Sequence, residues 1–229
     1  MPKIYLSPAA HGRDNPCGYD SACGENIHCN LYIDELEPYL LACGFAVRRN
    51  PKDRTGDRLK EAIAESNAWG ADLHYVAHTN AGGGAYSLLM VYDQGTAYGY
   101  AEKLAARRRE IYAGNVKISV QPQWDELRLT AAPAVYDEMV FHDNAKDIAW
   151  FHEHLREMAE ATAKAICDMF GAAFVDPYAK PAEPAPEPEP DGDVWYRVQV
   201  GAFREKANAD RLCAELQGKG YAAFVKAGA

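Results

Sequence analysis

Four polar residues follow or flank short apolar runs, and together they could carry out hydrolysis. They are His11 in IYLSPAAHGRD, Glu25 in CGENIHC, His78 in LHYVAHTNA and Glu138 in PAVYDEMVFHDN. Two imidazoles and a carboxylate form a set that holds a catalytic zinc ion and leaves a fourth position open for water. A second carboxylate close to such a site can move a proton. These residue types therefore indicate hydrolytic zinc chemistry.

The segments around these residues predict an α/β domain that brings them to one end of a sheet. Strands are expected at Lys3–Ser7, Phe45–Arg48, Asp72–Ala77, Ser87–Tyr92 and Pro133–Glu138, and helices at Cys29–Cys43, Asp57–Ala68, Tyr98–Tyr112 and Ala145–Phe170. Strands that alternate with helices imply a mostly parallel sheet with helices on both faces. His11, His78 and Glu138 fall at or just after the carboxyl ends of predicted strands, where such sheets bind ligands.

Three further residues compete for a place in this site. His74 shares a strand face with His78, but four residues of extended chain separate the two by roughly 13 Å, which is too far for one zinc ion. His142 remains an alternative member of the site. Asp137 and Glu138 are adjacent in a predicted strand, so their side chains point to opposite faces and only one can address the metal.

Taken in order, the four segments resemble the zinc-dependent N-acetylmuramoyl-L-alanine amidases of the type 3 family. The resemblance covers the whole of the first domain. It implies that His11, Glu25 and His78 bind one zinc ion per catalytic domain. It also selects Glu138, rather than Asp137, as the catalytic acid–base residue.

The resemblance implies a peptidoglycan hydrolase that cleaves the amide between N-acetylmuramic acid and L-alanine, with a role in cell-wall degradation or lysis. Asn80 matches the family's His-x-Asn phrase and is expected to contact the substrate. The residues alone support only a zinc hydrolase of the amide type. Another zinc-dependent wall hydrolase, such as a carboxypeptidase or a deacetylase, and a non-catalytic wall-binding protein are the alternatives.

The chain is expected to continue beyond the catalytic domain, residues 1–175, into a linker and a small module. Residues 176–193 contain six prolines that alternate with acidic residues, a composition that cannot form a packed core and is typical of a semi-rigid linker. Residues 194–229 predict a strand, a helix and a second strand, a small βαβ segment. Its phrase YRVQVGAFREKANADRLCAELQGKGYAAFV resembles the first half of a SPOR domain, a module associated with peptidoglycan glycan strands.

Composition and charge exclude several other classes of function. The 229 residues carry a net charge of -9 and no basic stripe, so nucleic acid is not an expected partner. No apolar run approaches the roughly 20 residues that span a bilayer, so membrane insertion is not expected. The N-terminus lacks the pattern of a secretory signal. The protein is therefore expected to be made in the cytoplasm and to reach the wall by phage-type lysis, or to have a leader that precedes this sequence.

The six cysteines are expected to be free thiols, because a domain of this size does not need disulfides for stability. Cys17, Cys23 and Cys29, with His28 beside them, are an alternative structural zinc site. Their spacing argues against it, since five residues separate successive cysteines, whereas known structural sites favour two to four.

Overall fold

The computed structural model describes residues 1–227 apart from 12–14, 16, 18–23, 52–57 and 180–197. The chain divides into two units, Met1–Ala179 and Lys180–Ala229. Among the residues described, no helix has both the length and the apolar character needed to cross a membrane. The predicted linker from residue 180 onward lies outside the described residues, so the predicted domain boundaries remain predictions.

The first unit is built on one six-stranded sheet in the order β2-β1-β3-β6-β4-β5. The strands are β1 (Lys3–Pro8), β2 (Ala46–Arg49), β3 (Leu73–Asn80), β4 (Tyr86–Val91), β5 (Asn115–Val120) and β6 (Ala134–Phe141). Strands β2, β1, β3 and β6 are parallel, whereas β4 runs antiparallel to β6 and pairs in parallel with β5. The central strands β3 and β6 are buried along almost their whole length, as expected of strands covered on both faces.

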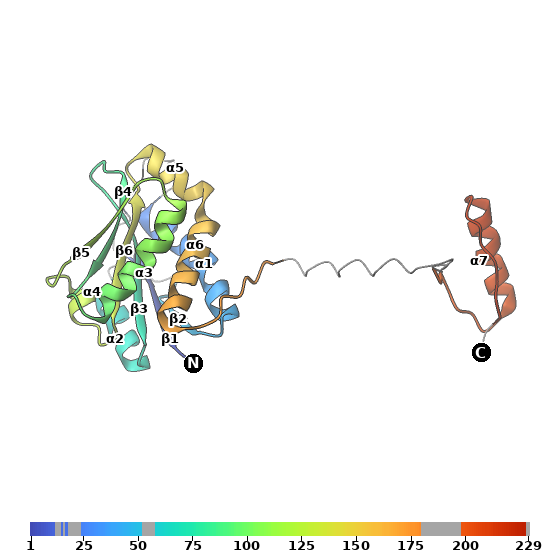
Figure 1. Ribbon diagram of the computed structural model, residues 1–229, viewed down its shortest axis with the longest axis horizontal. Coiled ribbons are helices and arrows are strands. Elements are labelled where there is room, and N and C mark those ends of the chain that lie inside the picture. The colour runs from blue at the N-terminus through green and yellow to red at the C-terminus, as the bar shows by residue number, and fades with distance from the viewer. Residues whose placement is uncertain (12–14, 16, 18–23, 52–57, 180–197, 228–229) are drawn as a thin grey trace, which may run out of the picture. The chain divides into compact units, whose positions relative to one another are not determined.

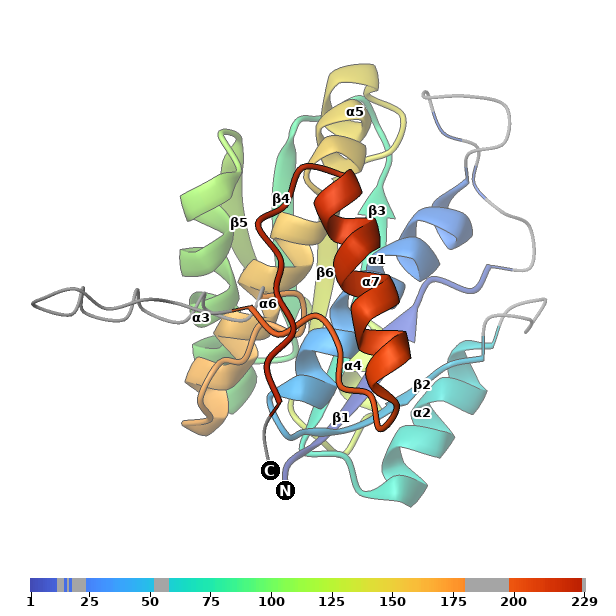
Figure 2. The ribbon, with the colours of Figure 1, turned by 90° about the vertical axis from the view of Figure 1, so that its right-hand side faces the viewer.

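Helices cover both faces of this sheet (Figures 1 and 2). They are α1 (Glu25–Ala42), α2 (Leu59–Trp69), α3 (Thr96–Ile111), α4 (Asp125–Arg128), α5 (Ala145–Glu153) and α6 (Leu155–Phe170). Helices α1, α3 and α6 pack together on one face, and α2 and α4 lie on the other. Helix α5 follows β6 at the end of the sheet where β1, β3 and β6 finish. The expected α/β class with a mostly parallel sheet is confirmed.

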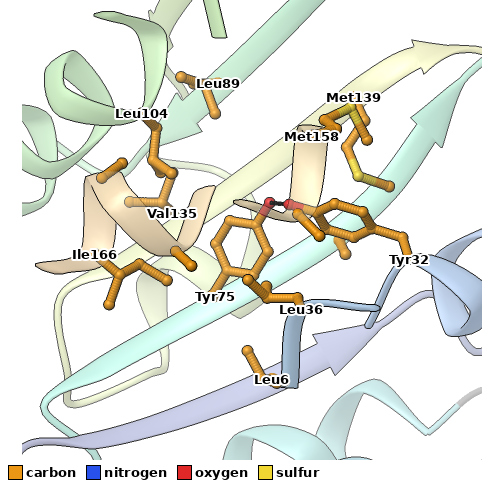
Figure 3. Close-up of a cluster of buried hydrophobic side chains, with 14 of the residues drawn as sticks. Leu6, Tyr32, Leu36, Tyr75, Leu89, Leu104, Val135, Met139, Met158 and Ile166 are labelled. Carbon is orange, nitrogen blue, oxygen red and sulfur yellow. Dashed lines mark hydrogen bonds between the residues drawn. The ribbon is translucent and has the colours of Figure 1, made fainter. Parts of the chain in front are cut away.

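The core beneath α1, α3 and α6 is mostly apolar and encloses two tyrosines, Tyr32 and Tyr75, whose hydroxyl groups have hydrogen-bond partners. Figure 3 shows Tyr32 of α1 and Tyr75 of β3 pointing toward each other among leucine, valine, isoleucine and methionine side chains. Their hydroxyl oxygens lie 3.1 Å apart, and Tyr32 also donates a hydrogen bond to Thr162 Oγ1 at 2.7 Å. Because buried hydroxyl groups need partners, these bonds help to fix α1 and α6 against β3.

Three features of the first unit differ from the sequence-based expectation, and the first is the short helix α4, which was not predicted. Strand β5 was not predicted, because NVKISV is only partly buried at the sheet edge and carries a weak apolar signal. The helical region predicted at Ala145–Phe170 is two helices that meet at His154, whose φ of -115° and ψ of 19° are not helical. The interruption lets α5 follow β6 while α6 packs along α1 and α3.

The residues that follow α6 pack against the first unit. The ring of Phe174 stacks on Tyr39 with 5.9 Å between centroids, and Tyr178 meets Tyr39 edge-on at 5.4 Å. The backbone N–H of Val175 donates to Cys43 Sγ at 3.2 Å. The first unit thus extends to Ala179, and Tyr39 of α1 offers an aromatic surface to Phe174 and Tyr178.

The second unit contains helix α7 (Lys206–Gly218), which matches the predicted helix. The flanking segments 198–203 and 221–225, predicted as strands, have no strand pairing in the part of this unit that the structure describes. A strand requires a partner with which to exchange backbone hydrogen bonds. Large apolar side chains also remain exposed here, namely Val198, Val200, Phe203, Tyr221 and Phe224. The described residues therefore do not form the expected βαβ segment.

The expectation that all cysteines are free is wrong for Cys17, which forms a disulfide. Cys29, Cys43, Cys167 and Cys213 are free thiols, and Cys23 lies outside the described residues. A sulfur in a disulfide is not available as a thiolate ligand, so Cys17 cannot contribute to the alternative structural zinc site. Domain size alone does not predict such a bond, because a disulfide can also form in a domain whose core is already sufficient for stability.

Candidate active site

Three elements bring the predicted metal ligands together at the carboxyl end of the sheet. His11 follows β1, His78 lies near the end of β3, and Glu25 is the first residue of α1. Strands β1 and β3 are adjacent and parallel, with Pro8 opposite Ala77, so their carboxyl ends meet. A carboxylate at the start of a helix is also stabilised by the helix dipole.

Glu25 lies between the two histidines and contacts both. Its Oε2 is 3.1 Å from His11 Nε2, and its Oε1 is 2.9 Å from His78 Nδ1. One donor atom from each of the three residues lies within 4.8 Å of the other two. Glu25 and His78 are buried, whereas the side chain of His11 is 40% exposed. The cluster is therefore open to solvent on the side of His11.

Neighbouring asparagines hold the cluster in place. The amide of Asn15 donates to Glu25 Oε2 at 2.6 Å. The side chain of Asn26 bonds both backbone groups of His11, accepting from its N–H at 3.0 Å and donating to its carbonyl at 3.2 Å. The N–H of Thr79 donates to Glu25 Oε1 at 3.2 Å. Asn15 and Asn26 were not predicted as members of the site, because such supporting hydrogen bonds leave no spacing signal in the sequence.

The electrostatics of the cluster favour an ionised Glu25. Burial by itself would raise the pKa of this carboxyl, but hydrogen bonds from His11 and His78 and the charge of His78 outweigh burial and hold the pKa well below its usual range. A carboxylate that remains charged is the form that binds a metal ion.

The donor set fits zinc in both chemistry and size. Nitrogen and carboxylate oxygen donors bind zinc at about 2.0–2.2 Å, which places neighbouring donors of a tetrahedral site roughly 3.3 Å apart. The distances of 3.1 Å and 2.9 Å from Glu25 to the two histidines are close to this separation. His11, Glu25 and His78 could therefore hold one zinc ion, and the exposure of His11 leaves a side open for water and substrate.

Glu138 of β6 lies beside this cluster on the same sheet face as His78. Its Cα pairs with that of His78 in the parallel register of β3 and β6. The side chain is 7% exposed, and its Oε2 has no hydrogen-bond partner among the residues described. Burial, followed by the charges of Glu25 and Asp137, raises the pKa of Glu138 to about 8. A buried carboxyl with a free oxygen and a pKa near neutrality has the properties of an acid–base group.

Asp137 points to the opposite face of the sheet, into the core. Its Oδ2 lies 2.7 Å from Arg108 Nη2 and accepts a hydrogen bond from the hydroxyl of Tyr75 at 2.6 Å. Both partners of this ion pair are almost fully buried. Strand alternation thus separates the two neighbouring acids. Arg108, which we did not predict to be buried, is the partner of Asp137 in the core.

Asp137→Asn is expected to destabilise the protein by about 3–5 kcal/mol, because it leaves the buried Arg108 without its charged partner. The measurement is the free energy of unfolding in urea. Arg107 and Asp168 form a matched control, since they pair at 2.8 Å on the surface. Asp168→Asn should cost at most about 1 kcal/mol. Equal losses in the two variants would contradict a special role for the buried pair.

The remaining candidates lie outside the cluster. His74 Nε2 is 2.9 Å from Glu126 Oε1, and Ser7 Oγ also donates to that oxygen at 2.5 Å. These buried hydrogen bonds of Glu126 join α4 to β1 and β3. Glu126 was not predicted to have such a role. His142 Nδ1 lies 2.9 Å from Thr79 Oγ1. Asn80 Oδ1 accepts from the N–H of Ala81, so a substrate contact for Asn80 remains a prediction.

Comparison with known proteins supports the interpretation of both parts of the chain. Residues 160–227 match the SPOR domain family. The chain is similar to the N-acetylmuramoyl-L-alanine amidase CwlM of Bacillus licheniformis, with 30% identity over 182 residues, which cover 75% of this chain and 64% of that protein. It is also similar to the sporulation-specific N-acetylmuramoyl-L-alanine amidase of Bacillus subtilis (strain 168), with 26% identity over 98% of this chain and 84% of that protein.

Solved structures show the same fold. The N-acetylmuramoyl-L-alanine amidase AmiC2 of Nostoc punctiforme superposes with a TM-score of 0.66 at 15% identity, over 74% of this chain and 97% of that chain. These similarities confirm the resemblance that the sequence suggested, to N-acetylmuramoyl-L-alanine amidases and, near the C-terminus, to the SPOR domain. The SPOR match begins within α6, upstream of the predicted start at residue 194.

Proposed function

We propose that this protein is a zinc-dependent N-acetylmuramoyl-L-alanine amidase that acts on the bacterial cell wall. The observation that carries the proposal is the clustering of His11, Glu25 and His78 within 4.8 Å, with the buried carboxyl of Glu138 beside them. The sequence similarity to amidases and the shared fold support it. The substrate is peptidoglycan, and catalysis is assigned to the first unit.

His11, Glu25 and His78 would hold the zinc ion, which when bound would polarise the scissile carbonyl and lower the pKa of a water molecule. Glu138 Oε2 accepts a proton from the attacking water, because this buried carboxylate oxygen has no other partner among the described residues. The same carboxyl then donates that proton to the nitrogen of the departing L-alanine. The charge of a bound zinc ion would lower the pKa of Glu138 and so favour its ionised form, which is the form that can accept the proton.

The proposal is tested by digestion of purified peptidoglycan, with and without a metal chelator, followed by mass analysis of the products. We expect stem peptides with a free amino terminus at L-alanine and glycan strands that are otherwise intact. Chelation should abolish the release, and added zinc should restore it. Released acetate would instead indicate a deacetylase, and a released terminal amino acid would indicate a carboxypeptidase. Binding to the wall without any product would indicate a non-catalytic wall-binding protein.

A further inference from the structure

An exposed tryptophan lies one aromatic ring away from the candidate active site. Trp124 immediately precedes α4 and is 37% exposed. Its ring meets that of Tyr136 at 4.9 Å between centroids, and Tyr136 in turn meets the imidazole of His78 at 4.5 Å. Tyr136 is two residues before Glu138 in β6, so both side chains lie on the same face of the sheet. Trp124 therefore borders the face on which the chemistry is proposed.

This tryptophan is held firmly in position. Its carbonyl accepts hydrogen bonds from the N–H groups of Leu127 at 3.1 Å and Arg128 at 2.9 Å. The helix that it precedes is anchored by Glu126, which bonds His74 and Ser7 beneath it. A large ring that is already fixed before binding loses little conformational entropy when a ligand contacts it.

The surroundings of Trp124 favour a neutral, polyhydroxylated ligand. The side-chain amides of Gln121 and Gln123 lie on the preceding loop and are bonded to each other at 2.5 Å. Amides can both donate to and accept from hydroxyl and acetamido groups. The nearby cation Arg128 is already paired with Asp125 at 2.6 Å. A stem peptide would present carboxylates, for which Arg128 is therefore not a free partner.

The connectivity of the substrate agrees with this position. In the bond that the proposed function cleaves, the scissile carbonyl belongs to a lactyl group attached directly to the sugar ring. The sugar must therefore lie next to the atoms that react at Glu138. One face of a pyranose ring carries C–H groups and can pack on an aromatic ring, while its edge forms hydrogen bonds.

We propose that Trp124 forms a sugar-binding subsite for the N-acetylmuramic acid ring, with Tyr136 positioning Trp124 against the active site. This assignment rests on the proposed function, because that function identifies the scissile bond and therefore the sugar next to it. The side chain of Trp124 packs on the sugar, and the amides of Gln121 and Gln123 meet its polar groups.

The first experiment compares two soluble substrates that differ only in the sugar, an N-acetylmuramoyl tripeptide and the corresponding D-lactoyl tripeptide. Trp124→Ala should raise KM for the sugar-containing substrate about tenfold, the size of an aromatic packing contribution, with little change in kcat. It should leave the kinetics of the D-lactoyl tripeptide unchanged. Trp124→Phe should retain most of the affinity, and Trp150→Phe, at a half-buried tryptophan of α5, should behave like the wild type.

A second experiment does not depend on activity. The disaccharide N-acetylglucosaminyl-N-acetylmuramic acid, without peptide, is titrated into the full chain while its tryptophan fluorescence is recorded. The sugar-dependent change should be lost in Trp124→Phe and kept in Trp150→Phe. An unchanged response in Trp124→Phe, or no response in the wild type, would overturn the subsite. So would an equal rise in KM for both substrates. If the wild type hydrolyses neither substrate, the proposed function fails, while the titration still decides whether Trp124 binds sugar.

Discussion

Glu138→Gln is expected to lower hydrolytic activity by about 100-fold or more while the zinc content and the fold remain intact. The amide keeps the size of the carboxyl but cannot accept a proton from water. Glu138 Oε2 is buried without a hydrogen-bond partner among the described residues, so the amide breaks no bond at that atom. The measurements are the rate of amide cleavage on a soluble muropeptide and the zinc content of the purified protein.

The stability of the same variant provides a second readout. Because the pKa of Glu138 is raised to about 8 in the folded, metal-free protein, folding favours the protonated carboxyl. The contribution of protonated Glu138 to the free energy of unfolding is fully present below the ordinary pKa of a glutamate. It is lost as the pH rises toward 8. Glu138→Gln, which cannot ionise, should therefore be less sensitive to pH in chelated samples over this range.

Asp137→Asn is the matched control for the assignment of Glu138. The two acids are neighbours in β6, yet Asp137 is bonded to Arg108 on the other face of the sheet. We expect Asp137→Asn to lose stability while its folded fraction retains activity. Glu138→Gln should instead keep its fold and lose activity. If Asp137→Asn loses hydrolytic activity and Glu138→Gln retains it, the assignment of the acid–base role to Glu138 is wrong.

His78→Ala is expected to reduce the bound zinc from one ion per chain to almost none. His78 is buried and 2.9 Å from Glu25, so its removal takes away one of three protein donors at the centre of the cluster. The loss of affinity should exceed the roughly 10–100-fold that removal of a supporting residue costs. Elemental analysis of the purified variant measures the zinc content, and the loss of activity should follow it.

His74→Gln separates loss of zinc from loss of stability. His74 lies on the same strand, but its Nε2 contacts Glu126 rather than Glu25. We expect this variant to be less stable, since it disturbs a buried hydrogen-bonded group, and yet to bind zinc fully. A full complement of zinc in His78→Ala, or its loss in His74→Gln, would show that the ligand assignment is wrong.

Local sequence patterns predicted most of the fold of the first unit. Apolar runs and helical periodicity located β1, β2, β3, β4 and β6 and helices α1, α2 and α3, because a side chain's direction repeats regularly along each element. The same regularity predicted that Asp137 and Glu138 face opposite sides of the sheet. The short edge strand β5 and the break at His154 were missed, since each depends on neighbours that are distant in sequence.

The sequence by itself determined which residues were candidates for chemistry and at which end of the sheet they would lie. It placed His11, His78 and Glu138 at one edge, because parallel strands collect their carboxyl-terminal residues there. The resemblance to the type 3 amidases added Glu25 and selected Glu138 over Asp137. Only the tertiary structure decided how these residues are supported and which neighbours join them. Asn15, Arg108, Glu126, Trp124 and Tyr136 reach their partners from separate elements. Contacts between separate elements depend on how the chain packs in three dimensions, which no local periodicity records.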